Sequence, residues 1–427
     1  MTQIETASAA PSKYRWLVLI TCFLLYLFGN YASFIMGLTM IPIREAMGID
    51  AAAGGMLSSL LMFGAVIGCI FAGRLANTWG SRNVVIASGF VVGICCIACA
   101  LTTNYALWLV LRFVTGLGYG AQLGPVVKLA ADHWAGPRQN MATAAILCSF
   151  PIAGLTASFA TKMFAADYRI VWALTAIAII PALLLLMVPS DKLSAAQIKA
   201  EQESGKNLGF SSIFEGNLKF VTVFAIIVSF MNMAGVWALG TWLPSWLIQE
   251  RGLSTDLMTN FSMVNYIGGF FGYFFWSWLG KKIGNPKSLI AGYFATAIAM
   301  VCYIAIPGTD LLFYLGPVLY FCQAVNVMCS ITFAEAFPRH IRAYGAGTCF
   351  NVGRVGSIIS PYSTALIGTA LGLTAGLATV PVFYAIGGLF GFGLKKFVKK
   401  QEQLEAAEGT PASDRQDALE SPVAQAE

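Results

Sequence analysis

Arg354 lies deep within an apolar segment of the sequence, where a charged side chain is costly unless it is used. A helix that begins near Ile341 would carry Arg354 about 20 Å along its axis, close to the middle of a bilayer. The chain has 20 Asp and Glu residues, and they fall at the ends of apolar segments, in polar links or in the tails. A planar guanidinium binds a carboxylate through two parallel hydrogen bonds. The sequence therefore predicts that Arg354 binds an anionic substrate, and the alternative is a structural role in bonding backbone carbonyls.

Two further cations, Arg112 and Lys128, also lie within apolar segments. Arg112 lies about 10 Å into its segment and is predicted to act in coupling or gating, with structural pairing as the alternative. Lys128 lies about 24 Å along the same segment, near its end. We include Lys128 in the coupling or gating set, although its long stem can reach water, which favours a plain interfacial lysine.

Uncharged polar and aromatic side chains at middle depth predict the rest of a substrate cavity. Amides and hydroxyls orient a ligand by hydrogen bonds, and aromatic faces stack on flat ligands. Each such residue taken singly is more simply explained as an interhelical hydrogen-bond partner. Besides Arg354, the predicted substrate-binding residues are Asn30, Tyr31, Ser33, Ser149, Asn232, Trp237, Asn265, Tyr266, Gln323, Asn326 and Asn351.

Charged residues at the ends of apolar segments predict a gate. Asp132 and Glu335 end two of these segments, each followed closely by arginines. Salt bridges there would close one side of the protein in one state and open in another. The alternative is plain surface pairs, since exposed ion pairs contribute about 1 kcal/mol or less. The predicted coupling or gating residues are Arg74, Arg82, Arg112, Lys128, Asp132, Arg138, Glu335 and Arg342.

The elements that position these residues are predicted to be membrane-spanning helices. Hydrophobic residues make up 57% of the 427-residue chain and charged residues 11%, whereas a soluble globule has about a quarter charged. Apolar runs of about 20 residues, each able to cross a bilayer, recur about twelve times. They lie near 16–41, 54–75, 83–101, 105–131, 139–165, 169–188, 219–247, 257–280, 285–306, 311–335, 341–368 and 373–394.

One polar interruption, from Ser190 to Lys219, divides the spans into two sets of six. The fold class predicted is an all-α membrane protein with about twelve transmembrane helices in two pseudo-symmetric six-helix bundles. The predicted divisions are an N-terminal cytoplasmic tail (1–15), a first bundle (16–188), a cytoplasmic linker (189–218), a second bundle (219–397) and a disordered cytoplasmic tail (398–427).

Lysines and arginines gather in the links on one side of the predicted spans, which places both termini in the cytoplasm. This bias accounts for the net charge of +6 without a nucleic-acid partner. We expect a monomer in a bacterial inner membrane. The sequence has no metal-spaced His cluster, nucleophile triad or phosphate loop, so neither an enzyme nor a metal or cofactor site is predicted.

Several motifs carry a resemblance to a known family. Gly73-Arg-Leu-Ala-Asn-Thr-Trp-Gly80-Ser-Arg82 resembles the G-x-L-A-D-R-x-G-R-R motif of the major facilitator superfamily, and residues 112–120 resemble its R-x-x-x-G-x-G-x-G motif. Residues 334–361 resemble the helix 10–11 region of the aromatic acid:proton symporters. The resemblance covers about residues 14–396 and implies transport by alternating access, with Arg112 acting in proton or gating energetics.

The sequence departs from these motifs at two places. Asn77 and Thr78 replace the Asp and Arg of the first motif, and residues 29–34 lack the D-G-x-D motif of the symporters. We therefore expect a symporter of a small organic anion, with the proton carried by the substrate, Asp132 or Glu335. The alternatives are an exchanger of organic anions without proton coupling and a sensor that keeps the fold but does not transport.

Overall fold

The computed structural model describes residues 14–134, 137–164, 167–189, 210–216, 218–338 and 341–408. Within these ranges the chain is helical and contains no β-strand. Nearly all of the predicted N-terminal tail, most of the predicted linker and residues 409–427 lie outside the described residues. The predicted helical fold class is confirmed.

Helices in the first half of the chain match the first six predicted spans. They are α1 (Arg15–Leu38), α2 (Met40–Met47), α3 (Ala51–Trp79), α4 (Ser81–Leu101), α5 (Tyr105–Gly120), α6 (Leu123–His133), α7 (Pro137–Leu147), α8 (Ser149–Met163), α9 (Tyr168–Ala173), the 3₁₀ segment η1 (Leu174–Ala178) and α10 (Ile179–Leu185).

Helices in the second half match the remaining six. They are η2 (Phe210–Phe214), α12 (Leu218–Gln249), α13 (Thr255–Ile283), α14 (Asn285–Ala305), α15 (Asp310–Gln323), η3 (Ala324–Asn326), α16 (Val327–Ala336), α17 (Arg342–Gly353), α18 (Val355–Leu371), α19 (Leu373–Leu377) and α20 (Thr379–Glu408). The helix α20 continues to Glu408, so the part of the predicted disordered tail that the structure describes is helical.

Ten of the described segments are helices long and apolar enough to cross a membrane. The two other predicted spans correspond to α13, which has polar and aromatic residues along its length, and to α17 with α18, which are separated at Arg354. The chain is therefore a multi-pass membrane protein.

Local sequence signals fix several helix ends. Asp50 and Asn104 cap α3 and α5 by accepting backbone hydrogen bonds from Ala53 (2.7 Å) and Leu107 (3.1 Å). Single glycines join α3 to α4 and α13 to α14: Gly80 has φ 85° and Gly284 has φ 95°. Residues with a Cβ atom are strained at such φ angles, which explains the glycine at both predicted links.

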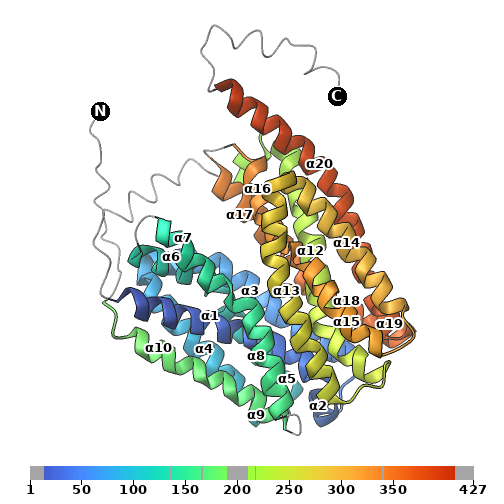
Figure 1. Ribbon diagram of the computed structural model, residues 1–427. Coiled ribbons are helices and arrows are strands. Elements are labelled where there is room, and N and C mark those ends of the chain that lie inside the picture. The colour runs from blue at the N-terminus through green and yellow to red at the C-terminus, as the bar shows by residue number, and fades with distance from the viewer. Residues whose placement is uncertain are drawn as a thin grey trace.

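Figure 1 shows two bundles, one of α1–α10 and one of α12–α20, which meet along a central interface. The halves touch at the end of the molecule where α2 and α9 lie, and they diverge toward α6, α7, α16 and α17. At the closed end, a methyl group on Gly37 would collide with the Gly240 carbonyl, and Lys162 lies 3.4 Å from Asp256 across the interface. The fold thus forms a bundle pair that is closed at one end.

Five of the described spans are interrupted near their middle, one of them by η1 between α9 and α10. The break between α5 and α6 falls where Pro125 cannot bond the Ala121 carbonyl, and the break between α7 and α8 falls where Pro151 cannot bond Leu147. In the second half, η3 interrupts one span and Arg354 separates α17 from α18. These breaks place polar side chains and free backbone groups near the centre of the protein.

Candidate functional site

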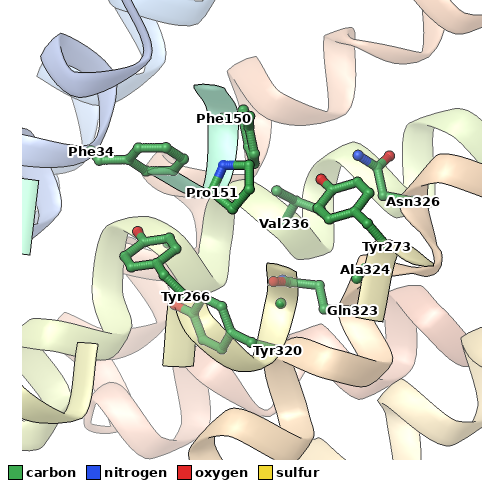
Figure 2. A pocket seen from close by; sticks show the side chains of 12 residues that line it. Phe34, Phe150, Pro151, Val236, Tyr266, Tyr273, Tyr320, Gln323, Ala324 and Asn326 are labelled. Carbon is green, nitrogen blue, oxygen red and sulfur yellow. The ribbon is translucent and has the colours of Figure 1, made fainter. Parts of the chain in front are cut away.

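A cavity lies between the two bundles at the level of these breaks (Figure 2). Its free volume is about 40 Å³, whereas an apolar cavity of about 150 Å³ is known to hold benzene. The lining residues are Phe34, Phe150, Pro151, Val236, Gly240, Tyr266, Gly269, Tyr273, Tyr320, Gln323, Ala324 and Asn326. The cavity in this conformation therefore has room for water but not for an aromatic ring.

Aromatic rings from both halves meet at one side of the cavity. The Phe34 ring of α1 lies 5.0 Å from the Phe150 ring, 5.2 Å from the Tyr266 ring and 6.3 Å from the Trp237 ring, all between centroids. Its plane is 15° from that of Trp237, which is a stacked arrangement. Tyr266 extends this group to Tyr320, at 5.4 Å. Such a group of rings suits a flat apolar ligand.

Amide side chains from the second half form the polar side of the cavity. Asn232 of α12 donates a hydrogen bond to Asn326, which lines the cavity. The Gln323 side chain also lines it, and its Nε2 is buried without a hydrogen-bond partner among the described residues. An unpaired buried donor costs about 1–3 kcal/mol, so a ligand or water that accepts from Gln323 would be favoured.

Arg354 lies at the junction of α17 and α18 and is half-buried, but it does not line the cavity. Its guanidinium lies over the Phe350 ring, 5.7 Å from the centroid, and within electrostatic range of Tyr26 and Tyr119 in the other half. In the part of the chain that the structure describes, no hydrogen bond or ion pair of this guanidinium is found. The predicted role of Arg354 in binding an anion stays a prediction.

Three predicted residues of α1 are bonded within the first half rather than exposed in the cavity. The Asn30 amide donates to the Tyr26 carbonyl (2.7 Å) and accepts from the Tyr119 hydroxyl (2.9 Å). The Tyr31 hydroxyl donates to the Val171 carbonyl (2.9 Å). Ser33 donates to the Gly29 carbonyl within its own helix (3.3 Å). The predicted role of these side chains as cavity-lining ligands does not match their positions here.

The other predicted ligands are placed differently from one another. Ser149 is buried, and its hydroxyl lacks a partner among the described residues, beside the cavity-lining Phe150. Asn265 contacts Gly316 of the neighbouring helix, away from the cavity. The Asn351 side-chain oxygen Oδ1 accepts a weak hydrogen bond from the Cys69 thiol of the other half, at 3.4 Å. Of the predicted set, Tyr266, Gln323 and Asn326 line the cavity, and Trp237 and Asn232 support it.

Arg112 is fully buried inside the first half and holds three of its helices together. Its guanidinium donates to the Leu57 carbonyl of α3 (3.3 Å) and the Ala32 carbonyl of α1 (3.1 Å), and it lies 5.2 Å from the Trp172 ring centroid. These contacts correspond to the structural alternative for Arg112. Its predicted part in coupling stays a prediction.

The other predicted gating residues lie at the end of the molecule where the bundles diverge. Arg82 donates to the Leu185 and Leu186 carbonyls, at 3.1 and 2.6 Å, and so caps α10. Glu335 accepts from Asn285, and Arg342 donates to the Phe337 carbonyl at 3.3 Å. The remaining four vary in exposure: Arg74, Asp132 and Arg138 are exposed, and Lys128 is half-buried.

Sequence reasoning missed four of the five aromatic residues that line the cavity, namely Phe34, Phe150, Tyr273 and Tyr320. In a chain with 30 Phe and 15 Tyr, one ring in an apolar helix resembles any other. A usable signal was Phe150-Pro151, since a proline inside a predicted span indicates a break and breaks gather at transporter sites. No group of His, Cys, Asp or Glu suited to a metal occurs among the described residues.

Comparison with known proteins gives consistent results for sequence and fold. The model of the Major Facilitator Superfamily matches residues 19–361. The 4-hydroxybenzoate transporter PcaK of Pseudomonas putida is 26% identical over 87% of this chain and 92% of its own length. The gentisate transporter of Corynebacterium glutamicum is 22% identical over 80% and 78%, respectively. A crystal structure of a D-xylose-proton symporter has a TM-score of 0.75 at 17% identity, covering 90% of this chain and 98% of that one.

Proposed function

Because the chain belongs to the Major Facilitator Superfamily and is a membrane transporter rather than an enzyme, we propose that it carries a small organic anion, of the aromatic acid class, across the bacterial inner membrane. The observation that carries the proposal is the pairing of a ring-lined cavity with a neighbouring arginine that has no carboxylate partner among the described residues. The relatives named for aromatic acids support the same substrate class.

In this proposal the two ends of the substrate are bound differently. The ring enters the aromatic side of the cavity, near Tyr266, and a polar ring substituent is hydrogen-bonded by Gln323. The carboxylate is bound by Arg354 through parallel hydrogen bonds. Tyr26 and Tyr119 of the other half lie close enough to Arg354 to interact with its charge. A carboxylate bound there would be shared between the two halves and would favour their closure around it.

In this proposal the diverging end of the bundles faces the cytoplasm, together with both termini, and the cationic links support this orientation. The structure then corresponds to a state open to the cytoplasm and closed on the outer side, where Gly37 meets Gly240 and Lys162 meets Asp256. Alternating access would release these outer contacts and bring the cytoplasmic ends together.

Proton-coupled symport is the mechanism we propose, with exchange of anions as the second candidate. The observation that favours exchange is in α1, where the neutral Asn30 is occupied in bonds to Tyr26 and Tyr119. No Asp or Glu is among the residues that line the cavity. Symport would then rely on protonation of the substrate or of Glu335, which is half-buried beside Asn285.

Counterflow in proteoliposomes tests the proposal. Uptake of labelled benzoate, 4-hydroxybenzoate and propionate is measured with and without an inside-alkaline gradient, with protein-free liposomes as the blank. The variants are Arg354→Gln and, as a matched control, Arg169→Gln, whose side chain is exposed at the opposite end of the molecule. Loss of one charge-assisted contact is expected to lower kcat/KM about 100-fold in the first variant only.

The pattern of uptake separates the mechanisms. Uptake driven by the gradient indicates symport, and uptake that ignores the gradient but requires trapped internal anion indicates exchange. Unaltered transport in Arg354→Gln would remove the arginine from the proposal. If no acid enters at all, the organic anion assignment is wrong.

A further inference from the structure

We propose that the Phe34 side chain occupies the place of the substrate's ring when the transporter is empty, so that an aromatic substrate must displace it. This inference rests on the proposed function and adds a specificity-determining residue to it. Figure 2 shows the Phe34 ring pointing into the cavity from α1, toward the side chains of the second half.

The surroundings of Phe34 have the composition of a ring-binding site. Phe150 meets its edge at 73°, Trp237 stacks on it at 15° and Tyr266 lies tilted at 60°. Phe34 is 7% exposed, so its ring is nearly enclosed by these neighbours. A site that holds one phenyl ring by these contacts would hold the ring of a benzoate-like acid by the same contacts.

The free volume of the cavity requires a displacement. The remaining space of about 40 Å³ is too small for an aromatic ring. Phe34 is the ring that the first half inserts between rings of the second half, through α1. Phe150 also comes from the first half, but as a wall it contacts Phe34 edge-on. Rotation of the Phe34 side chain, or withdrawal of α1, would vacate the enclosed position without moving the other three rings.

The displacement would also link binding to the change of state. The turn of α1 that follows Phe34 carries Gly37, which packs on the Gly240 carbonyl at the closed end. Expelling the Phe34 ring would therefore push on the segment that seals the outer side. An acid without a ring would leave Phe34 in place and would not exert this push.

If Phe34 occupies the ring site and Phe150 only borders it, truncating the two side chains has opposite effects on binding, and this makes the inference testable. Binding of labelled benzoate to purified detergent-solubilised protein is measured for wild type, Phe34→Ala and Phe150→Ala. Removing the Phe34 ring ends its competition with the ligand, so Phe34→Ala is expected to lower the Kd about tenfold. Removing the wall takes away ring contacts, so Phe150→Ala is expected to raise the Kd about threefold to tenfold.

Matched controls separate ring displacement from general loosening. Phe261→Ala truncates a ring of equal burial, 6% exposed, that pairs with Phe313 and does not line the cavity. It is expected to leave the Kd unchanged. Propionate, which has no ring, is expected to bind Phe34→Ala and wild type alike. Phe34→Leu retains apolar volume without a ring and is expected to give an intermediate Kd, which keeps the test available if Phe34→Ala does not fold.

Two results would overturn the inference while leaving the proposed function intact. One is a wild type that binds benzoate and a Phe34→Ala or Phe34→Leu variant that binds it equally or more weakly. The other is an equal gain for propionate, which would mean that the truncation merely enlarges the cavity. A wild type that binds no acid would instead contradict the proposed function, and this inference with it.

Discussion

The two intramembrane arginines, one in each half, lie in contrasting environments. Arg112 is fully buried, bonded to carbonyls of two neighbouring helices and packed near Trp172. Arg354 is half-buried at a helix break, and the contact described for its guanidinium is with the Phe350 ring. The charge is the same, but Arg112 is used to join helices, whereas Arg354 is the residue that the proposed function assigns to the ligand. An arginine within a span is therefore assigned by its partners and not by its depth.

Asn30 of the first half and two amides of the second half show a similar contrast, although Gln122 of the first half is also buried with its amide unpaired among the described residues. Asn30 uses both ends of its side chain in hydrogen bonds within the first half. In the second half, Asn232 has an unpaired oxygen and Gln323 an unpaired nitrogen among the described residues. The second half therefore supplies most of the polar binding capacity around the cavity, whereas the first half inserts apolar rings into it. This assignment of roles to the two halves would be wrong if amides of the first half were found to contact the substrate.

The largest effect is expected from truncating the two arginines to alanine. Arg112→Ala removes the bonds among α1, α3 and α5 and leaves a cavity, so it is expected to lower the free energy of unfolding by about 3 kcal/mol. Arg354→Ala is expected to change it by less than about 1 kcal/mol. Thermal unfolding followed by size-exclusion fluorescence measures both. Equal losses would mean that the two environments are energetically alike.

A smaller effect is expected from exchanging amides for leucine. Gln323→Leu is expected to raise the KM of hydroxylated aromatic acids about tenfold and to leave stability unchanged, because its Nε2 has no bond to lose. Asn30→Leu is expected to lower stability by about 1–2 kcal/mol, because it breaks bonds to Tyr26 and Tyr119. Transport and unfolding assays on both variants test the division. The reverse pattern would assign substrate contact to the first half.

The smallest effect is expected at the contact between the halves. The side chains of Lys162 and Asp256 are 35% and 61% exposed, so their ion pair contributes about 1 kcal/mol or less. Lys162→Gln is expected to shift the balance of states by no more than about fivefold toward the outward-open form. The balance is measured by the rate of Cys69 alkylation in a variant whose other cysteines are replaced. This rate is expected to fall as the diverging ends come together. Lys162→Arg preserves the ion pair, so its Cys69 should be alkylated at the rate of the parent protein. A complete change of state in Lys162→Gln would mean that the ion pair contributes more than this estimate.

Much of the architecture was predictable because it depends on local signals. Hydropathy located the spans, and Gly80 and Gly284 indicated the two tight links, which the structure confirms with positive φ angles. Pro125 and Pro151 coincide with two of the interruptions. The break at Arg354 has no proline four residues later, so its sequence signal was only the flanking glycines.

The site was harder to predict because it depends on where each side chain points. Tyr31 and Tyr266 both have phenols at middle depth, but one bonds Val171 inside its own half and the other faces the cavity. Helical rotation and tilt decide between these outcomes, and hydropathy carries little information about either. Phe34 was missed for the opposite reason: an apolar ring gave no sign that its helix face turned toward the cavity.

The single-glycine turns have a mechanical consequence. With only Gly80 between them, the joined ends of α3 and α4 must move together, so a tilt of α3 at the central interface displaces the adjoining end of α4. On its outward surface α4 exposes Ile94 and Leu101, at 55% and 80%. These side chains would sweep through the hydrocarbon layer during each cycle. We therefore expect the turnover rate to depend on bilayer thickness and stiffness, with the membrane itself acting as a load on transport.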